Sequence, residues 1–412
     1  MQLVKSLSAL ALLGAAIPST YALSIKDDVV SVGVKVQMQI RAQLLNDADN
    51  ATGANYDPLR GTNGEAEFAR FYIRRARFAL AAKYGDWRAN FQIRGGEGSD
   101  RNVGGDARAV QLYYANGARV FKTGDIEHDV HFGLDKPFNS ESSISSSAQL
   151  FPTERIVAQM IETRNVGVGY GLRSSFVNFG VDLMNNSTTT KDAEAGDNIG
   201  ADETNGYFYS ARVEIMPGKE YNPGKRLESY VGKEGFHVVG GIDAQWDDGN
   251  LSNGAISGLA VTPGTQIRVT DAFTWGPDLL VHWNFLTFLA EARLRTTDVE
   301  DVVNATGATT SRDFKSSWYN VQLAYAIPLE SGHVIEPAIR YMERDDNRSI
   351  DNTAAVYGAS NDNGGDGTTI DLGVNLYFNG HANKLQLAYQ MWEAEEGDAQ
   401  ARIVRLQHQV SF

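Results

Sequence analysis

The sequence predicts an all-β fold, a transmembrane antiparallel up-and-down β-barrel of about 16 strands with long external loops and short periplasmic turns. Three observations support this prediction. Several segments alternate strictly between apolar and polar side chains. Short and long links between these segments alternate along the chain. The first residues have the pattern of an export signal.

The alternation is clearest near the carboxyl end. In residues 369–378 the even positions are Ile, Leu, Val, Leu and Phe, whereas the odd positions are mainly polar. The same period of two occurs in residues 236–246, 319–327 and 404–412. Successive side chains of a strand point to opposite faces, so each segment has one apolar and one polar face. A soluble β-sandwich also alternates, and the lengths of the links are needed to separate the two folds.

Tight links are expected at several positions that carry turn residues. They are Gly85-Asp86, Asn116-Gly117, Tyr170-Gly171, Trp283-Asn284, 329–332 and 379–383. Long polar stretches lie between them, at 46–66, 95–108, 125–163, 185–205, 246–267, 300–313, 345–367 and 395–400. One link, 217–235, is too long and too charged for a tight turn. Eight long loops predict about sixteen strands in a closed antiparallel barrel.

Residues 1–22 are expected to be a cleaved signal peptide, which leaves 23–412 as the barrel. Lys5 supplies the positive start, an apolar stretch follows from Leu7 to Ile17, and Ala22 ends a small-residue cleavage pattern. The apolar stretch is too short to span a bilayer. The mature chain is therefore either secreted or crosses a membrane as strands.

Composition excludes several classes of protein. The chain has 412 residues and no cysteine, so a disulfide framework, a cysteine-based metal site and a thiol nucleophile are excluded. The formal net charge is -14, which argues against nucleic-acid binding because that depends on neutralising phosphates. Glycine is frequent, at 41 residues, and aromatic residues make up 10%. This combination suits strands and turns.

The net charge is concentrated in three of the long stretches. Residues 46–66, 185–205 and 345–367 together hold 14 acids and 3 bases. Removing them leaves a chain that is close to neutral, so a basic barrel interior is compatible with the overall composition.

Aromatic residues gather near the proposed strand ends, where an interfacial belt is expected. They are Trp246, Trp275, Trp283, Trp318, Tyr341, Tyr377, Tyr389 and Trp392. Core packing is the alternative explanation for them. Phe412 closes the last alternating strand, and bacterial outer-membrane barrels commonly end in such an aromatic residue, which resembles the signal for their assembly machinery.

Four segments resemble the phosphate-selective porin O and P family. Residues 71–78, FYIRRARF, followed by Gly85-Asp86-Trp87, resemble an early strand of that family. Residues 135–138, DKPF, are similar to its K-E-P-F segment, and 151–155, FPTER, to its F-x-E-R stretch with one residue inserted. Residues 369–378 resemble its G-x-N-W-Y strand, with Leu376 where Trp is usual. The resemblance implies a sixteen-stranded, trimeric outer-membrane channel for small anions with an arginine-lined pore and an inward-folded third loop.

The most basic segment, residues 67–94, supplies the first candidate pore residues. An anion path needs cations where water is scarce, and the arginine fork suits phosphate oxygens. Strict alternation would send either Arg74 or Arg75 to lipid, at a cost of about 2–4 kcal/mol at mid-membrane. We expect a β-bulge there that turns both inward together with Arg77. Pairing of these arginines with acids or lipopolysaccharide at the rim is the alternative.

The long stretch at 125–163 is the expected constriction, since loops of this length are usually functional. Lys136 and Arg155 are its candidate cations. The candidate hydroxyl donors are Ser142, Ser143, Ser145, Ser146 and Ser147. On the opposite wall, Arg293 and Arg295 share a face with Glu291, and Arg340 and Arg344 share one with Glu336. A lumen with both signs of charge would favour general diffusion over tight anion binding.

No catalytic, metal or cofactor site is expected. Asp125, Glu127, His128, Asp129 and His131 form a ligand-rich cluster, but a solvated or pore-lining role fits it better than metal binding. The glycine-rich run at 166–171 lacks the Lys-Ser/Thr and the helix of a phosphate loop. No G-x-S-x-G motif occurs, so a barrel hydrolase is not supported.

The sequence therefore predicts a porin in the outer membrane of a Gram-negative bacterium, in contact with lipid and lipopolysaccharide, and a homotrimer as the family implies. It would conduct small hydrophilic solutes passively, with a preference for anions such as phosphate. The alternatives are a non-selective general porin and a secreted β-rich binding or adhesin protein, which would be soluble without detergent.

Overall fold

The structure is a computed structural model of the chain, and it describes most of the strands and their tight turns. The described residues are 24–26, 30–46, 68–95, 111–144, 164–185, 207–216, 235–251, 265–303, 308–347, 367–394 and 400–412. The expected signal peptide and most of the long stretches lie outside them. Among the described residues, no helix is long and apolar enough to cross a membrane.

Strands make up nearly all of the described chain. Their bounds are β1 Ser24–Lys26, β2 Val30–Asn46, β3 Phe68–Tyr84, β4 Trp87–Gly95, β5 Gln111–Thr123, β6 Ile126–Asp135, β7 Asn165–Arg173, β8 Val177–Asn185, β9 Tyr207–Ile215, β10 Phe236–Leu251, β11 Thr265–Trp283, β12 Leu286–Val303, β13 Ala308–Tyr325, β14 Ile327–Pro328, β15 Val334–Asn347, β16 Gly367–Asn379, β17 Asn383–Ala394 and β18 Gln400–Ser411. Among the described residues there is also a short helix, α2, at Glu141–Ile144.

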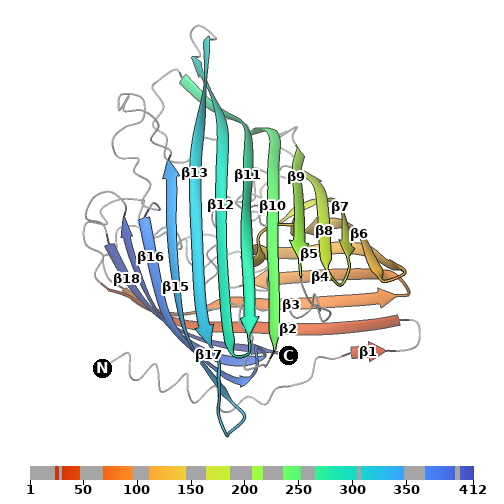
Figure 1. Cartoon of the computed structure of the whole chain (residues 1–412), viewed down its shortest axis with the longest axis vertical. Helices are drawn as coiled ribbons and strands as arrows, with labels where there is room; N and C mark the ends of the chain where they lie inside the picture. The colour runs from red at the N-terminus through yellow and green to blue at the C-terminus, as the bar shows by residue number, and fades with distance from the viewer. Residues whose placement is uncertain are drawn as a thin grey trace.

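The strands form one closed antiparallel barrel (Figure 1). Each strand pairs with the next along the chain, except that β13 and the short β14 both pair with β15. β18 pairs with β2 to close the ring. Phe412 continues that closure, since its backbone N–H and carbonyl both bond to Val36. Apart from the short β1 and β14, the ring consists of sixteen long strands, which confirms the predicted fold class and strand count.

The two faces of the barrel follow the predicted alternation. On β13, Tyr319, Val321 and Leu323 are exposed outward, whereas Asn320 and Gln322 are buried on the inner face. On β16, Ile370, Leu372 and Val374 are exposed, whereas Asp371 and Asn375 are buried. The outer surface is thus apolar and the interior polar, as a lipid-embedded barrel requires.

Two of the predicted tight links were wrong. Asn116-Gly117 lies inside β5, and the turn that follows is at Gly124-Asp125. Gly117 packs under an aromatic ring: a Cβ there would lie 2.7 Å from the tip of the Phe132 ring on the neighbouring strand. Tyr170-Gly171 lies inside β7, and that hairpin turns at residues 174–176. Tertiary contact overrides the local turn preference at Gly117.

The start of the predicted constriction loop, placed at residue 125, was also wrong. Residues 126–135 form β6, which pairs with β5 from Thr123↔Ile126 to Ala115↔Leu134. The link to β7 therefore begins at Lys136, and it is described up to Ile144 and again from Arg164. The charged residues of 125–135 hid the strand because they occupy its inward positions.

The aromatic belt was predicted correctly only in part. Trp246, Trp275, Trp283 and Tyr341 are exposed on the outer face. Trp318, Tyr377 and Trp392 are buried inside the barrel, where the Tyr377 hydroxyl donates a hydrogen bond to Glu336. Proximity to a strand end does not determine the face, which depends on the parity of the position.

The wall of the barrel differs in height around the ring, as Figure 1 shows for the tall β10–β13 and the short β6–β9. β11 has 19 residues, whereas β7 has 9 and β6 has 10. A nine-residue strand is about 30 Å long, so at a tilt of about 40° it rises about 23 Å. The short wall barely matches the apolar band of about 25 Å that a lipid-facing barrel needs.

Replacing Val321 with Arg tests the assignment of the outer face. Val321 is 42% exposed on the outer face of β13, four residues before the strand ends at Tyr325. We expect V321R to lower the free energy of unfolding from lipid vesicles by about 2–4 kcal/mol, because a guanidinium within the membrane is poorly solvated. Denaturant titration of refolding measures this, with V321L as the control of similar size. Equal stability of V321R and V321L would contradict the lipid-facing assignment.

Candidate functional site in the barrel interior

A β-bulge in β3 turns the basic segment toward the barrel interior. Gln39 of β2 opposes Arg75, but the next residue, Ile40, opposes Ile73, so Arg74 is the extra residue. Phe71, Ile73 and Phe78 are exposed outside, whereas Arg75 and Arg77 are buried inside. Arg74 is half-buried. The expected bulge is present, and because of it Arg75 faces the barrel interior instead of the lipid.

A second bulge occurs in β5, at Tyr113. Gln92 of β4 opposes Tyr114, and Ile93 opposes Leu112, so Tyr113 is the extra residue. Leu112 is 51% exposed outside, whereas Tyr113 is 6% exposed inside the barrel. Tyr114 also faces inward, since it lines the two cavities described below. Two consecutive tyrosines are thereby turned to the same face.

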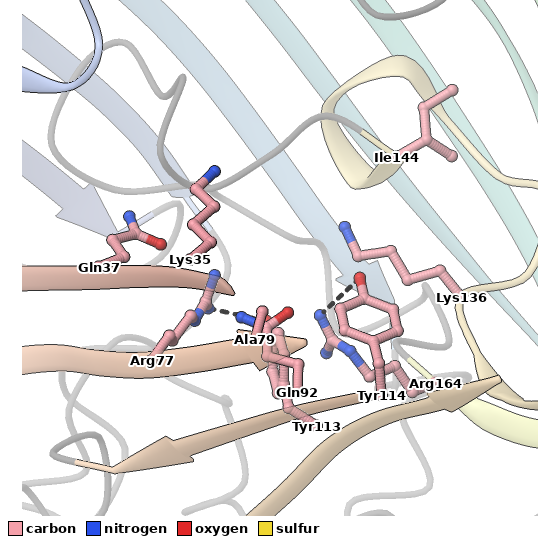
Figure 2. A pocket seen from close by; sticks show the side chains of 10 residues that line it. All are labelled: Lys35, Gln37, Arg77, Ala79, Gln92, Tyr113, Tyr114, Lys136, Ile144 and Arg164. Atoms are coloured by element: carbon pink, nitrogen blue, oxygen red, sulfur yellow. Dashed lines mark hydrogen bonds between the residues drawn. The ribbon is translucent and has the colours of Figure 1, made fainter. Parts of the chain in front are cut away.

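These two strands line a cavity of about 190 Å³, here called the cationic cavity. Its lining residues are Lys35, Gln37, Arg77, Ala79, Gln92, Tyr113, Tyr114, Lys136, Ile144 and Arg164. Figure 2 shows these side chains converging from β2–β5 and from both ends of the β6–β7 link. The described lining contains four cations and no carboxylate. Arg77 donates a hydrogen bond to the Tyr113 hydroxyl at 2.8 Å, and Arg164 donates one to the Tyr114 hydroxyl at 3.3 Å.

A second cavity of about 650 Å³, here called the mixed cavity, adjoins the first. Lys136, Tyr114 and Ile144 line both. The mixed cavity contains Lys83, Arg88 and Arg173 but also Asp129 and Asp135. Arg173 is paired with Glu127 at 3.1 Å, so part of this positive charge is balanced. The described lining of the mixed cavity thus holds four lysines and arginines and two carboxylates, and Lys136 connects it to the cationic cavity.

The β6–β7 link is bound to the inner wall through Phe138. A Cβ on Gly180 would overlap the Phe138 ring, and one on Gly171 would lie 3.3 Å from it, so these glycines form a socket for the ring. The backbone N–H of Phe138 donates to Asp182 at 2.6 Å. Asp182 also accepts a hydrogen bond from Ser210 and is within 2.8 Å of the His131 ring nitrogen Nε2. The ring of Phe138 is therefore packed against the wall, and its backbone N–H is hydrogen-bonded at the same place.

The helix α2 gives the link a second attachment. The backbone N–H of Glu141 donates to Asp278 of β11 at 3.3 Å, and its carboxylate lies 3.6 Å from Arg212 of β9. Asn139, Ser140 and Glu141 are fully buried. Residues 136–144 therefore run inside the barrel, across β8, β9 and β11, rather than outside it.

The other side of the barrel carries ion pairs. Both terminal guanidinium nitrogens of Arg212 donate to the carboxylate of Asp278, Nη2 at 2.8 Å. The Nη2 nitrogen of Arg293 lies 2.8 Å from the Asp243 carboxylate and 3.3 Å from that of Asp278. Arg340 donates to Asp371 at 2.8 Å. All three arginines are almost completely buried. A buried cation needs such partners, because its desolvation is otherwise too costly.

The predicted site residues thus divide into several groups. Arg77 and Lys136 line the cationic cavity, and Arg75 is buried on the same strand as Arg77, where it donates a hydrogen bond to Gln39. Arg293 and Arg340 lie in ion pairs on the other side of the barrel. Arg295 is 3.9 Å from Asp247, and Arg344 lies opposite Trp318 and Gly367. Arg155, Ser145, Ser146 and Ser147 lie outside the described residues, as do the side chains of Ser142 and Ser143.

Sequence reasoning missed Arg164, Lys35 and the two tyrosines. Arg164 follows a long polar stretch, and nothing in its neighbourhood marks it. Lys35 shares the parity of Gln37 and Gln39 on an alternating strand, so its face could have been found from the pattern. The bulge at Tyr113 leaves no signal except a run of two aromatic residues.

The Asp125–His131 cluster is part of β6 and its preceding turn. His131 points inward, between Asp129 at 3.2 Å and Asp182 at 2.8 Å. His128 lies on the outer face, where it stacks on Phe121 and hydrogen-bonds the Tyr170 hydroxyl at 2.7 Å. Residues three apart on a strand face opposite ways, so the two histidines cannot bind one ion together.

Solved structures of outer-membrane channels share this fold. OmpF of Salmonella typhi, in complex with daunomycin, aligns with a TM-score of 0.54 and 12% identity, covering 95% of this chain and 100% of that one. The channel DcaP of Acinetobacter baumannii aligns with a TM-score of 0.53 and 14% identity, covering 94% of this chain and 99% of that one. The anion-selective porin from Comamonas acidovorans aligns with a TM-score of 0.51 and 13% identity, covering 93% of this chain and 100% of that one. A comparison with curated proteins finds no match.

The sequence itself carries the family assignment, because structural likeness at such identities shows the fold alone. The model of the family described as phosphate-selective porin O and P matches residues 47–412, which is nearly the whole predicted barrel. The closed barrel, its polar interior and the β6–β7 link that runs inside it agree with that match. The chain belongs to the phosphate-selective porin O and P family and is an outer-membrane porin channel.

Proposed function

We propose that the channel passes small hydrophilic solutes by passive diffusion and prefers anions such as phosphate. The observation that carries this proposal is the cationic cavity, with four cations and no carboxylate among its described lining residues. An anion that sheds part of its hydration shell needs charge-assisted donors in compensation. Arg77 and Arg164 offer planar forks for oxygen atoms, and Lys35 and Lys136 add mobile point charges.

The opposite wall contributes little to this preference. Arg293 and Arg340, predicted as selectivity residues, are bound to carboxylates, so their charge is balanced within a few ångströms. The preference therefore rests on Arg77 and Lys136 of the original set, and the role of Arg75 stays a prediction. The roles of Arg74, Arg155, Arg295, Arg344 and the loop serines stay predictions.

The link from Lys136 to Ile144 sets the width of the passage in this proposal. It runs inside the barrel, and its residues Lys136 and Ile144 line the cavity opposite Lys35 and Arg77. Attachment through Phe138 and Glu141 holds this segment against β8, β9 and β11. The aperture then lies between the link and the basic wall formed by β2–β5.

A non-selective general porin is the second candidate. Fixed charges of both signs on facing walls favour it, since they orient dipoles without binding one ion. The mixed cavity and the ion pairs of Arg212 and Arg293 have this character. Anion preference is favoured over it because Lys136 and the cationic cavity adjoin the narrow segment.

We also propose a homotrimer in the outer membrane of a Gram-negative bacterium, surrounded by lipid and lipopolysaccharide, without enzymatic activity. The short wall of β6 and β7 supports self-association. Its outer face carries His128 beside Tyr170 and the exposed Arg119 near Phe121, which suit a protein contact better than lipid. A second copy that covers this wall would spare it from matching the bilayer thickness.

Reversal potentials in planar bilayers test the anion preference. In a tenfold potassium chloride gradient across purified wild-type channels, we expect a higher permeability for chloride than for potassium. K136Q and R77Q should each lower that ratio by about twofold or more, because each removes one of the few charges that face the aperture. Lys315, exposed on the outer face of β13, gives the control K315Q, whose ratio should stay at the wild-type value. A cation-selective wild type would overturn the proposal.

Replacing Phe138 with Ala tests the constriction. The ring fills the socket at Gly171 and Gly180, so its loss removes up to about 3–5 kcal/mol of packing from the attachment of the link. We expect a larger and noisier single-channel conductance with an intact barrel. Phe273, exposed on the outer face of β11, gives the control F273A, which should conduct like the wild type. Unchanged conductance in F138A would show that the link does not limit the passage.

Analytical ultracentrifugation in detergent tests the homotrimer. Val168 is 54% exposed on the outer face of β7. We expect wild-type trimers, and monomers with the V168R variant, because a guanidinium would be buried unpaired in the subunit contact. A monomeric wild type would contradict self-association, and a trimeric V168R would move the contact away from the short wall.

A further inference from the structure

A buried aromatic ring at the cationic cavity lies close to three arginines, two of which line the cavity. The centroid of the Tyr113 ring lies 3.4 Å from the guanidinium carbon of Arg164, 4.3 Å from that of Arg77 and 4.7 Å from that of Arg94. Tyr113 itself is 6% exposed, and it occupies the extra position of the β5 bulge. Three cations thus surround one ring whose position depends on a local break in the strand pattern (Figure 2 shows Arg77 and Arg164 beside it).

The three arginines come from separate parts of the chain. Arg77 is on β3, Arg94 is on β4, and Arg164 directly precedes β7 at the return of the long link. Like charges repel, and the repulsion is strong where water is partly excluded. The negative face of an aromatic ring attracts each guanidinium, and the Tyr113 hydroxyl additionally accepts a hydrogen bond from Arg77.

A carboxylate could gather arginines equally well, as Asp278 does for Arg212 and Arg293 on the other side of the barrel. It would also cancel one positive charge. The ring of Tyr113 attracts the cations without adding a negative charge, so it can concentrate the field instead of neutralising it. The two sides of the barrel therefore use different partners for the same side chain.

We propose that Tyr113 is a positioning residue for anion selectivity and that Arg164, held on its ring, is a further selectivity residue. The inference rests on the proposed anion preference. It also gives the long link a second function, since the link supplies Lys136 at its start and Arg164 at its return to one cavity. The bulge in β5 is the structural element that makes this possible, because without it either Tyr113 or Tyr114 would face outward.

Three variants separate the ring, the hydroxyl and the charge. Y113F keeps the ring and removes the hydrogen bond to Arg77, Y113L removes the ring and keeps an apolar side chain, and R164Q removes one charge. The chloride-to-potassium permeability ratio is measured for each full-length protein in a potassium chloride gradient. We expect Y113L and R164Q to lower the ratio by at least about twofold, with Y113F close to the wild type.

The outcomes distinguish this inference from the proposed function. A cation-selective wild type overturns both. An anion-selective wild type with an unchanged ratio in Y113L and R164Q overturns the inference alone. If the permeability ratio of Y113F is as low as that of Y113L, the hydroxyl and not the ring is responsible, which overturns the role proposed for the ring. Heat-modifiable migration in SDS gels shows which variants fold, and if Y113L does not fold, R164Q and Y113F decide.

Discussion

The absence of water from a bilayer core is the constraint on which the rest of this structure depends. Every backbone N–H and carbonyl that crosses the membrane must be bonded within the protein, and a closed antiparallel barrel achieves this with no free edge. Pairing of β18 with β2, continued by Phe412 against Val36, completes the closure. Closure also divides every strand between lipid and lumen with a period of two, so all polar chemistry is confined to one residue in two along each strand.

Function then depends on the places where this period is broken. The bulges at Arg74 in β3 and at Tyr113 in β5 each let adjacent side chains avoid the lipid side. Both lie on the wall that lines the cationic cavity. A regular strand could not present Tyr113 and Tyr114 together to the lumen, and the arginines would lose the ring that gathers them. A small irregularity in backbone pairing thus decides the local density of positive charge.

Glycine has a related part in holding the link. Gly171 and Gly180 leave space on the inner face for the ring of Phe138, and Gly241 and Gly276 lie against the guanidinium groups of Arg212 and Arg293. Large side chains inside the barrel need such space because adjacent strands are only about 5 Å apart, so side chains on neighbouring strands crowd one another. The glycine content that first indicated turns therefore also serves packing within strands, which explains why Gly117 was mistaken for part of a turn.

The sequence by itself determined the fold class, the number of long strands, the faces of β10, β13 and β16 and the family, because these follow from a period of two and from motifs contiguous in the chain. It also indicated the bulge at Arg74-Arg75, since two adjacent arginines in an apolar strand leave few other solutions. Only the tertiary structure decided which arginines are paired. Arg293 and Arg77 look alike in sequence, yet one meets Asp243 and Asp278 and the other a tyrosine ring. Those partners lie one or two strands away in the ring. Their register is set by pairing around the whole ring, and no local pattern encodes it.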